Sequence, residues 1–216
     1  SMTYLAFNYE KEPFDDENVR QAISHAIDLE SIINEIQDGR GVLASTHISP
    51  SVIGHDESQD EMAFDLDQAR EYLNQSDYAD GFDATLWISD DEVNRDIALF
   101  MQDRLSEIDI NLEIEQYEFG TFLEMAEQGD HDMFMLQWIT VTGDPDYGLY
   151  PMFHTESQDG SGNRWNYSNP ELDEVLEAGR QESDEGTREE HYAEAQEILV
   201  NDLPITPLYY GELGPG

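Results

Sequence analysis

The chain has 216 residues, enough for one or two domains, and carries 50 acidic against nine basic side chains, for a formal net charge of −41. This balance excludes nucleic acid as a partner, because no basic patch is present to neutralise phosphates. The absence of cysteine excludes disulfides, thiol nucleophiles and thiolate metal sites, and no stretch approaches the ~20 apolar residues of a membrane span.

Hydrophobic periodicity predicts an α/β fold. Strands are predicted at 3–9, 82–89, 111–117, 133–140 and 205–210. Helices are predicted from a cap at Asp15 or Asp16 to 27, from 29 to 37, from a cap at Asp65 to 74, over 93–108, from a cap at Thr121 to about 128, from Pro170 onward, and over 187–201. Strands alternate with helices between 82 and 140, which predicts right-handed crossovers and a sheet flanked by helices.

Two details of this pattern carry specific expectations. Val93 should face the core with the other apolar residues of its helix. Pro204 and Pro207 place the segment 205–210 at a sheet edge or in a connection, because proline cannot donate to a central ladder.

The acidic residues are spread along every segment, and Lys11 is the only lysine. So large a charge of one sign repels itself and destabilises the compact state at low salt. Screening reduces the Debye length from about 10 Å at 0.1 M to about 3 Å at 1 M salt. An acidic, lysine-poor surface around a periodic core therefore indicates a protein adapted to molar salt. The alternative is an acidic interaction module, but such modules usually carry blocks of like charge.

The stretch 133–167 concentrates the candidate functional residues. A predicted buried strand, 133–140, is followed by a loop with turn residues, and loops at strand ends commonly carry binding residues. Trp138, Trp165 and Tyr167 combine large apolar rings with a polar edge, which suits a pocket wall, although core packing explains such residues equally well. Arg164 could pair with a ligand carboxylate or with a neighbouring acid of the chain.

Catalytic and metal-binding motifs are absent from the sequence: it has no HExxH spacing, nucleophile elbow, phosphate-binding loop or dinucleotide fingerprint. Asp144 and Asp146 flank a proline and could form a general acid and base pair or half of a calcium loop, but such pairs are common in so acidic a chain and turn-forming aspartates explain them as well. We therefore expect a protein that is not an enzyme and needs no cofactor. An acidic hydrolase using these two residues is the alternative.

The order of short motifs resembles the family 5 solute-binding proteins of ABC transporters, which bind dipeptides, oligopeptides or nickel. The matching segments, in chain order, are 4–8, 13–16, 19–28, 39–41, 48–50, 82–87, Trp138 with 144–146, 149–154, 166–173 and 203–210. The resemblance spans nearly the whole chain.

The resemblance implies a periplasmic-binding-protein-like (type II) lobe with a central mixed sheet flanked by helices. It further implies that residues 1–216 form the C-terminal lobe, with connections to a missing N-terminal lobe near 3–9 and 204–210. The implied function is capture of a small solute (a peptide, sugar or metal chelate) for a membrane permease, from a lipid-anchored position outside the cell. A sensor lobe without transport would share this fold.

One departure from the family pattern concerns the solute. Peptide-binding members carry an aspartate three residues after the tryptophan that corresponds to Trp138, and it pairs with the amino terminus of the ligand. The same count here leads to Val141, which we expect to be buried and unable to pair with an ammonium group. Asp144, on the same loop, is the candidate substitute.

Overall fold

The computed structural model describes residues 1–158 and 160–211 and centres on a six-stranded sheet with the order β2-β6-β1-β5-β3-β4. The strands are β1 Met2–Phe7, β2 Val42–Leu43, β3 Phe82–Ser89, β4 Ile110–Tyr117, β5 Met133–Trp138 and β6 Ile205–Tyr210. β3 runs parallel to β4 and β5, whereas β1 runs antiparallel to β5 and β6. The sheet is therefore mixed, as predicted.

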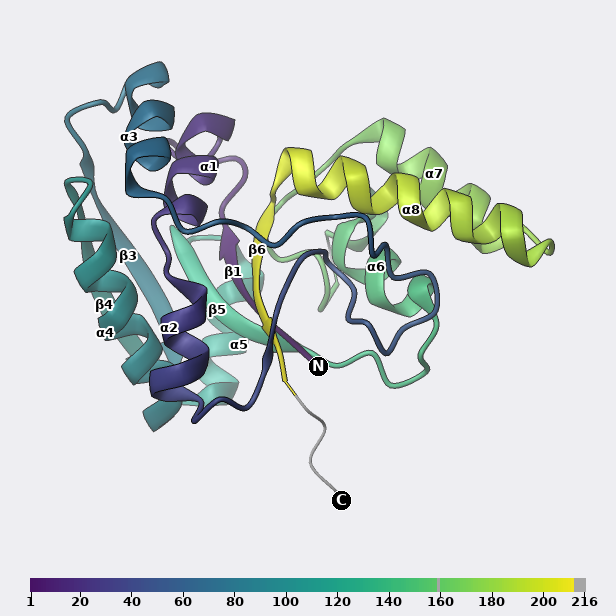
Figure 1. Cartoon of the computed structure of the whole chain (residues 1–216), viewed down its shortest axis with the longest axis horizontal. Coiled ribbons are helices and arrows are strands. Elements are labelled where there is room, and N and C mark those ends of the chain that lie inside the picture. The colour runs from purple at the N-terminus through teal and green to yellow at the C-terminus, as the bar shows by residue number, and fades with distance from the viewer. Residues whose placement is uncertain (159, 212–216) are drawn as a thin grey trace.

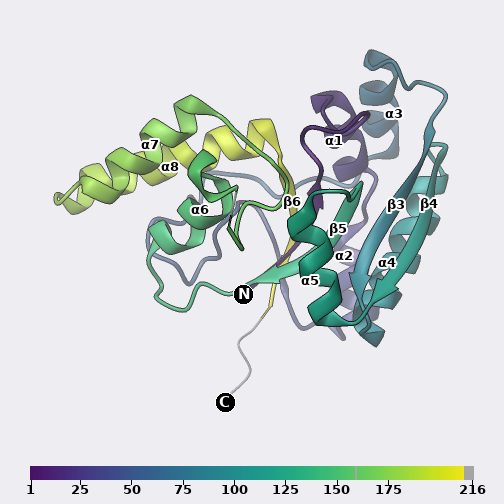
Figure 2. The ribbon, with the colours of Figure 1, turned by 180° about the vertical axis from the view of Figure 1, so that it is seen from behind.

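Helices cover both faces of the sheet (Figures 1 and 2). Their bounds are α1 Glu17–His25, α2 Leu29–Ser31, α3 Leu66–Gln75, α4 Glu92–Ser106, α5 Phe119–Gln128, α6 Pro145–Phe153, α7 Pro170–Gln181 and α8 Glu185–Asp202. A π-helical turn, Ile32–Ile36, follows α2, and a 3₁₀ turn, Thr155–Ser157, follows α6. One core cluster joins the sheet to α1, α3 and α4, and a second joins the other face to α5, α6, α7 and α8.

Aspartate side chains start most of the helices, as expected for so acidic a chain. Asp16, Asp65, Asp91 and Asp144 each accept a hydrogen bond from a backbone N–H in the first turn of the helix that follows. Two predicted starts were wrong. Glu118, not Thr121, caps α5. Asp184 caps α8, which therefore begins at Glu185, two residues before the predicted start at 187. In both cases the capping acid lies three residues before a threonine, and the threonine is also a residue type that commonly caps helices.

Three further expectations were wrong. The strand that begins at Met133 ends at Trp138, and residues 145–153, expected to be loop, form α6. Val93 is 40% exposed, because it lies in the first turn of α4, beyond the end of the sheet it was expected to cover.

β6 is not an edge strand, since it lies between β1 and β2. β2 pairs only with Tyr209 and Tyr210, so the first part of β6 has a ladder on one side alone. Pro207 lies opposite Tyr4, where the β1–β6 register shifts between Thr3 and Tyr4. Pro207 is therefore accommodated at a register shift, in the part of β6 that pairs with β1 but not with β2.

Candidate binding surface

The carboxyl ends of β3, β4 and β5 meet at one edge of the sheet, which we call the carboxyl edge. The three strands run parallel and end at Ser89, Tyr117 and Trp138. Helices α4, α5 and α6 begin just beyond these ends. In open α/β sheets, ligands bind in the crevice outside the carboxyl ends of the strands. The topology therefore marks this edge as the candidate site.

Both ends of the described chain also lie at the carboxyl edge, where the N label of Figure 1 marks the start of β1. Met2 pairs with Trp138 on one side and with Tyr210 on the other. The backbone N–H of Gly211 donates to the carbonyl of Ser1 at 3.1 Å, and the side-chain amide of Gln137 donates to Ser1 Oγ at 3.0 Å. β1 and β6 therefore enter and leave the lobe side by side.

Apolar side chains are exposed mainly at this edge. Of the nine large apolar residues that are exposed among the described residues, seven lie there; these are Val42, Ile53, Val93, Phe119, Ile139, Val141 and Tyr147. Val42 pairs with Tyr210, and the backbone N–H of Ile53 donates to the carbonyl of Gly143 at 3.2 Å, which ties both segments to the edge. Exposed apolar residues gathered at one edge of so charged a protein indicate a binding surface.

Trp138 forms the aromatic part of this surface. Its ring lies against that of Tyr147, with centroids 5.7 Å apart and planes inclined by 34°. Val141 is 73% exposed, so the expectation that it would be buried was wrong; the loop after β5 leaves the sheet instead of continuing it. The half-buried Trp138 and the exposed Val141 are the predicted site residues that the structure places at the carboxyl edge.

Asp144 lies on the same loop, but its carboxylate already has hydrogen-bond partners within the chain. It caps α6 by accepting from the backbone N–H of Asp146, and Arg188 Nη2 donates to its carboxylate at 2.8 Å. Partial burial raises the pKa of Asp144, but the bonds from Arg188 and the Asp146 backbone outweigh burial and hold it below the usual value. Asp144 is thus an ionised structural residue.

The remaining predicted residues lie at the opposite edge. Trp165 and Tyr167 have no exposed surface and belong to the core cluster with α5 to α8. Their segment is attached beyond the end of β1, where the backbone N–H of Tyr9 donates to the carbonyl of Trp165 at 3.0 Å. Arg164 is buried and its Nη2 donates to Glu127 at 3.2 Å. We therefore leave these three residues out of the candidate surface.

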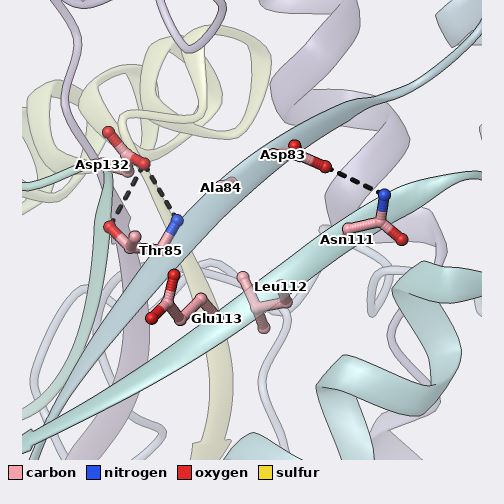
Figure 3. A pocket seen from close by; sticks show the side chains of 7 residues that line it. All are labelled: Asp83, Ala84, Thr85, Asn111, Leu112, Glu113 and Asp132. Carbon is pink, nitrogen blue, oxygen red and sulfur yellow. Dashed lines mark hydrogen bonds between the residues drawn. The ribbon is translucent and has the colours of Figure 1, made fainter.

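A second concave surface lies at the amino ends of β3 and β4 (Figure 3). This depression of about 300 Å³ is lined mainly by polar side chains, among them Asp83, Glu113 and Asp132. Thr85 donates to Asp132 through its backbone N–H and its hydroxyl, at 2.9 and 3.2 Å, and Lys11 pairs with the same carboxylate at 2.6 Å. Within residues 1–158 and 160–211, no group of three or more metal-ligating side chains is arranged to hold an ion. The depression therefore presents acids, of which Asp83 and Asp132 already have partners in the chain, instead of the exposed apolar residues found at the carboxyl edge.

The comparisons with known proteins place the chain in a family. Residues 1–160 match the model of the bacterial extracellular solute-binding proteins, family 5, middle region. The chain belongs to this family. It is 32% identical over 216 residues to the di/tripeptide-binding protein 1 of Pseudomonas aeruginosa, an alignment that covers 96% of this chain and 40% of that protein.

Two solved structures show the same fold. The periplasmic binding protein DppA of Helicobacter pylori, in complex with the peptide STSA, superposes with a TM-score of 0.93 at 30% identity, over 97% of this chain and 41% of that one. The dipeptide-binding protein of a Pseudoalteromonas species, in complex with Met-Leu, superposes with a TM-score of 0.92 at 32% identity, over 97% of this chain and 42% of that one. The chain thus spans about two fifths of the length of these relatives.

None of the helices in the described part of the chain has the length and apolar composition needed to cross a membrane.

Proposed function

We propose that this family-5 chain is one lobe of the substrate-binding component of an ABC importer, which captures a small solute and delivers it to a membrane permease. The apolar surface at the carboxyl edge carries the proposal. Seven of the nine large apolar residues that are exposed in the described chain lie there, at the edge where open α/β sheets bind ligands. The relatives named above are binding proteins, which favours a receptor over an enzyme.

We further propose that residues 1–216 form the C-terminal lobe and that the N-terminal lobe docks on the carboxyl edge. The chain covers 40% of the length of a relative, and β1 and β6 both have their outer ends at this edge. The two connections predicted near 3–9 and 204–210 would then continue outward from Ser1 and Gly211, because both segments are themselves buried strands. The solute would be enclosed between Trp138 on this lobe and the opposing lobe.

The solute we propose is a short peptide or a related small molecule. The relatives include a di/tripeptide-binding protein and two binding proteins solved with peptides. Val141 stands where the family resemblance leads us to expect an aspartate, and Asp144 is paired with Arg188. The amino terminus of a peptide would therefore need an acid elsewhere, which keeps sugars and metal chelates as alternative solutes. We place the full receptor on the outer face of the cytoplasmic membrane, anchored by lipid.

Calorimetric titration of the full-length receptor with dipeptides and tripeptides in molar KCl tests this function. Trp138→Ala should weaken binding at least about tenfold, which corresponds to about 1.4 kcal/mol. Leu99→Ala is the matched control, because Leu99 is an apolar residue on α4 with 46% exposure that lies outside the proposed surface. Equal affinities for the two variants would refute the placement of the solute at Trp138.

A further inference from the structure

A further pocket, of about 210 Å³, lies against the first part of β6; we call it the β6 pocket. The chain that follows β2 contacts this strand at two points. The backbone N–H of Ala44 donates to the carbonyl of Leu208 at 3.4 Å, and His47 Nε2 lies 3.2 Å from the carbonyl oxygen of Ile205. Residues 206 and 207, between the two points, line the pocket. The pocket therefore exists because β2 pairs only with the last two residues of β6.

Residues 60–63 form another wall, which we call the strap. The strap belongs to the irregular segment that runs in front of β6 toward α3 in Figure 1. His25, the last residue of α1, fixes it there: His25 Nδ1 lies 2.8 Å from the carbonyl oxygen of Ala63, and the carbonyl of His25 accepts from the backbone N–H of Asp65 at 2.9 Å. The end of α8 supplies the remaining wall. The pocket is thus enclosed by four parts of the chain that lie far apart in the sequence.

The walls are mainly apolar. Their apolar residues are Ala44, Met62, Ala63, Val200, Leu203 and Pro207. The hydroxyl of Thr206, a polar wall residue, is already hydrogen-bonded to that of Ser24. A cavity of about 150 Å³ with apolar walls is enough to bind benzene. By the same measure the β6 pocket accommodates roughly eight non-hydrogen atoms, the size of a ring with a short arm.

The charges around the pocket favour a cation. Asp60 and Glu61 are exposed residues of the strap, and neither carboxylate takes part in an ion pair or a side-chain hydrogen bond within residues 1–158 and 160–211. The walls contributed by these residues contain no lysine or arginine. Burial lowers the pKa of His47 to about 4, so this wall residue is neutral near pH 7 and does not repel a positive charge. The net charge of −41 also attracts cations from a distance.

We propose that the β6 pocket binds a small organic cation, with an apolar body such as an aromatic ring inside the pocket and a primary ammonium group beside Asp60 and Glu61. This site is separate from the carboxyl edge. The inference therefore does not depend on the proposed function, and a failure of one leaves the other standing.

Three ligands of similar size separate the contribution of the ring from that of the charge: benzylammonium, neutral benzyl alcohol and anionic benzoate. We expect benzylammonium to bind the 216-residue chain about threefold or more tightly than benzyl alcohol, as solvent-exposed ion pairs allow, and benzoate to bind most weakly of the three. Methylammonium, which lacks the ring, should bind more weakly than benzylammonium because it buries little apolar surface. The titrations use the lowest KCl concentration at which the chain is folded, because salt screens the ion pairs.

The charge is tested with the double variant Asp60→Asn and Glu61→Gln. It should bind benzylammonium no more tightly than benzyl alcohol and should keep the wild-type affinity for the alcohol. Asp77→Asn with Asp80→Asn is the matched control, because it changes the net charge by the same amount at two exposed positions outside the pocket. The control should retain the preference for the cation.

The place of binding is tested with Val200→Phe, which fills the pocket from α8 and should weaken the binding of benzylammonium and benzyl alcohol alike. Ile198→Phe is its control, since Ile198 is half-buried on the same helix but does not line the pocket. Dispersed amide spectra confirm that each variant is folded.

Methyl spectra of the labelled chain locate the ligand directly. Benzylammonium should shift the methyl signals of Met62 and Val200, whereas shifts confined to Val42 and Val141 would show binding at the carboxyl edge instead. The proposal is overturned if Met62 and Val200 do not respond, if benzyl alcohol binds as tightly as benzylammonium, or if the preference for the cation persists after substitution of Asp60 and Glu61.

Discussion

The guanidinium group of Arg180 clasps the carboxylate of Asp146 with two hydrogen bonds, from Nε to Oδ1 at 2.9 Å and from Nη2 to Oδ2 at 3.0 Å. The same guanidinium lies over the ring of Tyr150, 3.4 Å from its centroid. Together with the Arg188–Asp144 pair, this contact fastens α6 to the α7–α8 hairpin that extends from the sheet in Figure 1. Asp144 and Asp146 thus hold the base of the candidate loop in place.

Asp146→Asn should therefore lower the free energy of unfolding without changing any catalytic rate. Arg180 is 44% exposed and Asp146 27%, so the loss should lie near the upper end of the range for exposed pairs, about 0.2–1 kcal/mol. Chemical denaturation in 0.2 M and 2 M KCl measures the loss, which salt should reduce. Arg180→Lys, which keeps the charge and loses the two-bond fork, is the matched control. Peptide or glycoside hydrolysis that disappears in Asp146→Asn would instead support the hydrolase alternative.

Truncation of the two tryptophans of the predicted pocket should affect different properties: Trp165→Ala should mainly lower stability, and Trp138→Ala should mainly weaken solute binding. Trp165 is fully buried beside Tyr4, with ring centroids 5.6 Å apart, so Trp165→Ala should cost about 3–5 kcal/mol of unfolding free energy. Trp138 lies half-buried at the rim, so Trp138→Ala should cost much less and act mainly on solute binding. Urea denaturation of the two variants checks this order. A larger destabilisation by Trp138→Ala would contradict the assignment of Trp165 to the core.

Stability should fall as the pH is lowered from about 6.5 toward 4, because burial lowers the pKa of His47 and of His131 to about 4. In that window the unfolded chain takes up protons that the folded chain cannot, so protons favour unfolding. Each histidine contributes a slope of up to ~1.4 kcal/mol per pH unit, and the contribution is flat above about pH 6.5.

Denaturation at pH 7 and pH 5 isolates the two histidines, since most carboxylates titrate below that window. His47→Gln and His131→Gln should each reduce the stability difference between the two pH values, and the double variant should nearly remove it. A difference that is unchanged in the double variant would show that other groups govern the acid response.

Salt should stabilise the fold strongly, because the net charge of −41 is distributed over the whole chain. Screening at molar salt shortens the Debye length to about 3 Å and removes most of the self-repulsion between exposed acids. We predict a melting temperature that rises steadily between 0.1 M and 2 M KCl, measured by far-UV circular dichroism. A melting temperature that stays constant over this range would contradict adaptation to high salt.

The elements predicted well from the sequence are those with strong local signals. Asp65 and Asn169 lie directly before amphipathic segments, and each caps the helix that was expected after it. α6 was missed because Gly148, Pro151 and its clustered aromatic residues give little apolar periodicity. α6 begins with the cap formed by Asp144, and an aspartate before a proline is just as compatible with a simple turn as with the start of a helix.

The site was predicted only in part, for reasons that involve distant segments. A tryptophan has the same local signature in a pocket wall and in a core, and the long-range contact of Trp165 with Tyr9 decides between them. The apolar surface draws Val42, Ile53 and Val93 from three separate stretches, which the sheet order brings to one edge. The signal that could have revealed this surface is the exposure of apolar residues in so acidic a protein. The sequence pattern alone does not show which apolar residues are exposed.

The central claim is that a solute binds at the carboxyl edge, and a thermal-shift screen of the full-length receptor in molar KCl tests it most directly. The panel comprises short peptides, Ni(II) chelates and oligosaccharides, each with the wild type, Trp138→Ala and Val141→Asp. A ligand at a hundredfold excess over its dissociation constant stabilises the native state by about 2.7 kcal/mol. We predict a raised melting temperature with one solute class, loss of that shift in Trp138→Ala, and a larger shift with peptides in Val141→Asp. A panel without any shift, or a shift that Trp138→Ala leaves unchanged, would contradict the account.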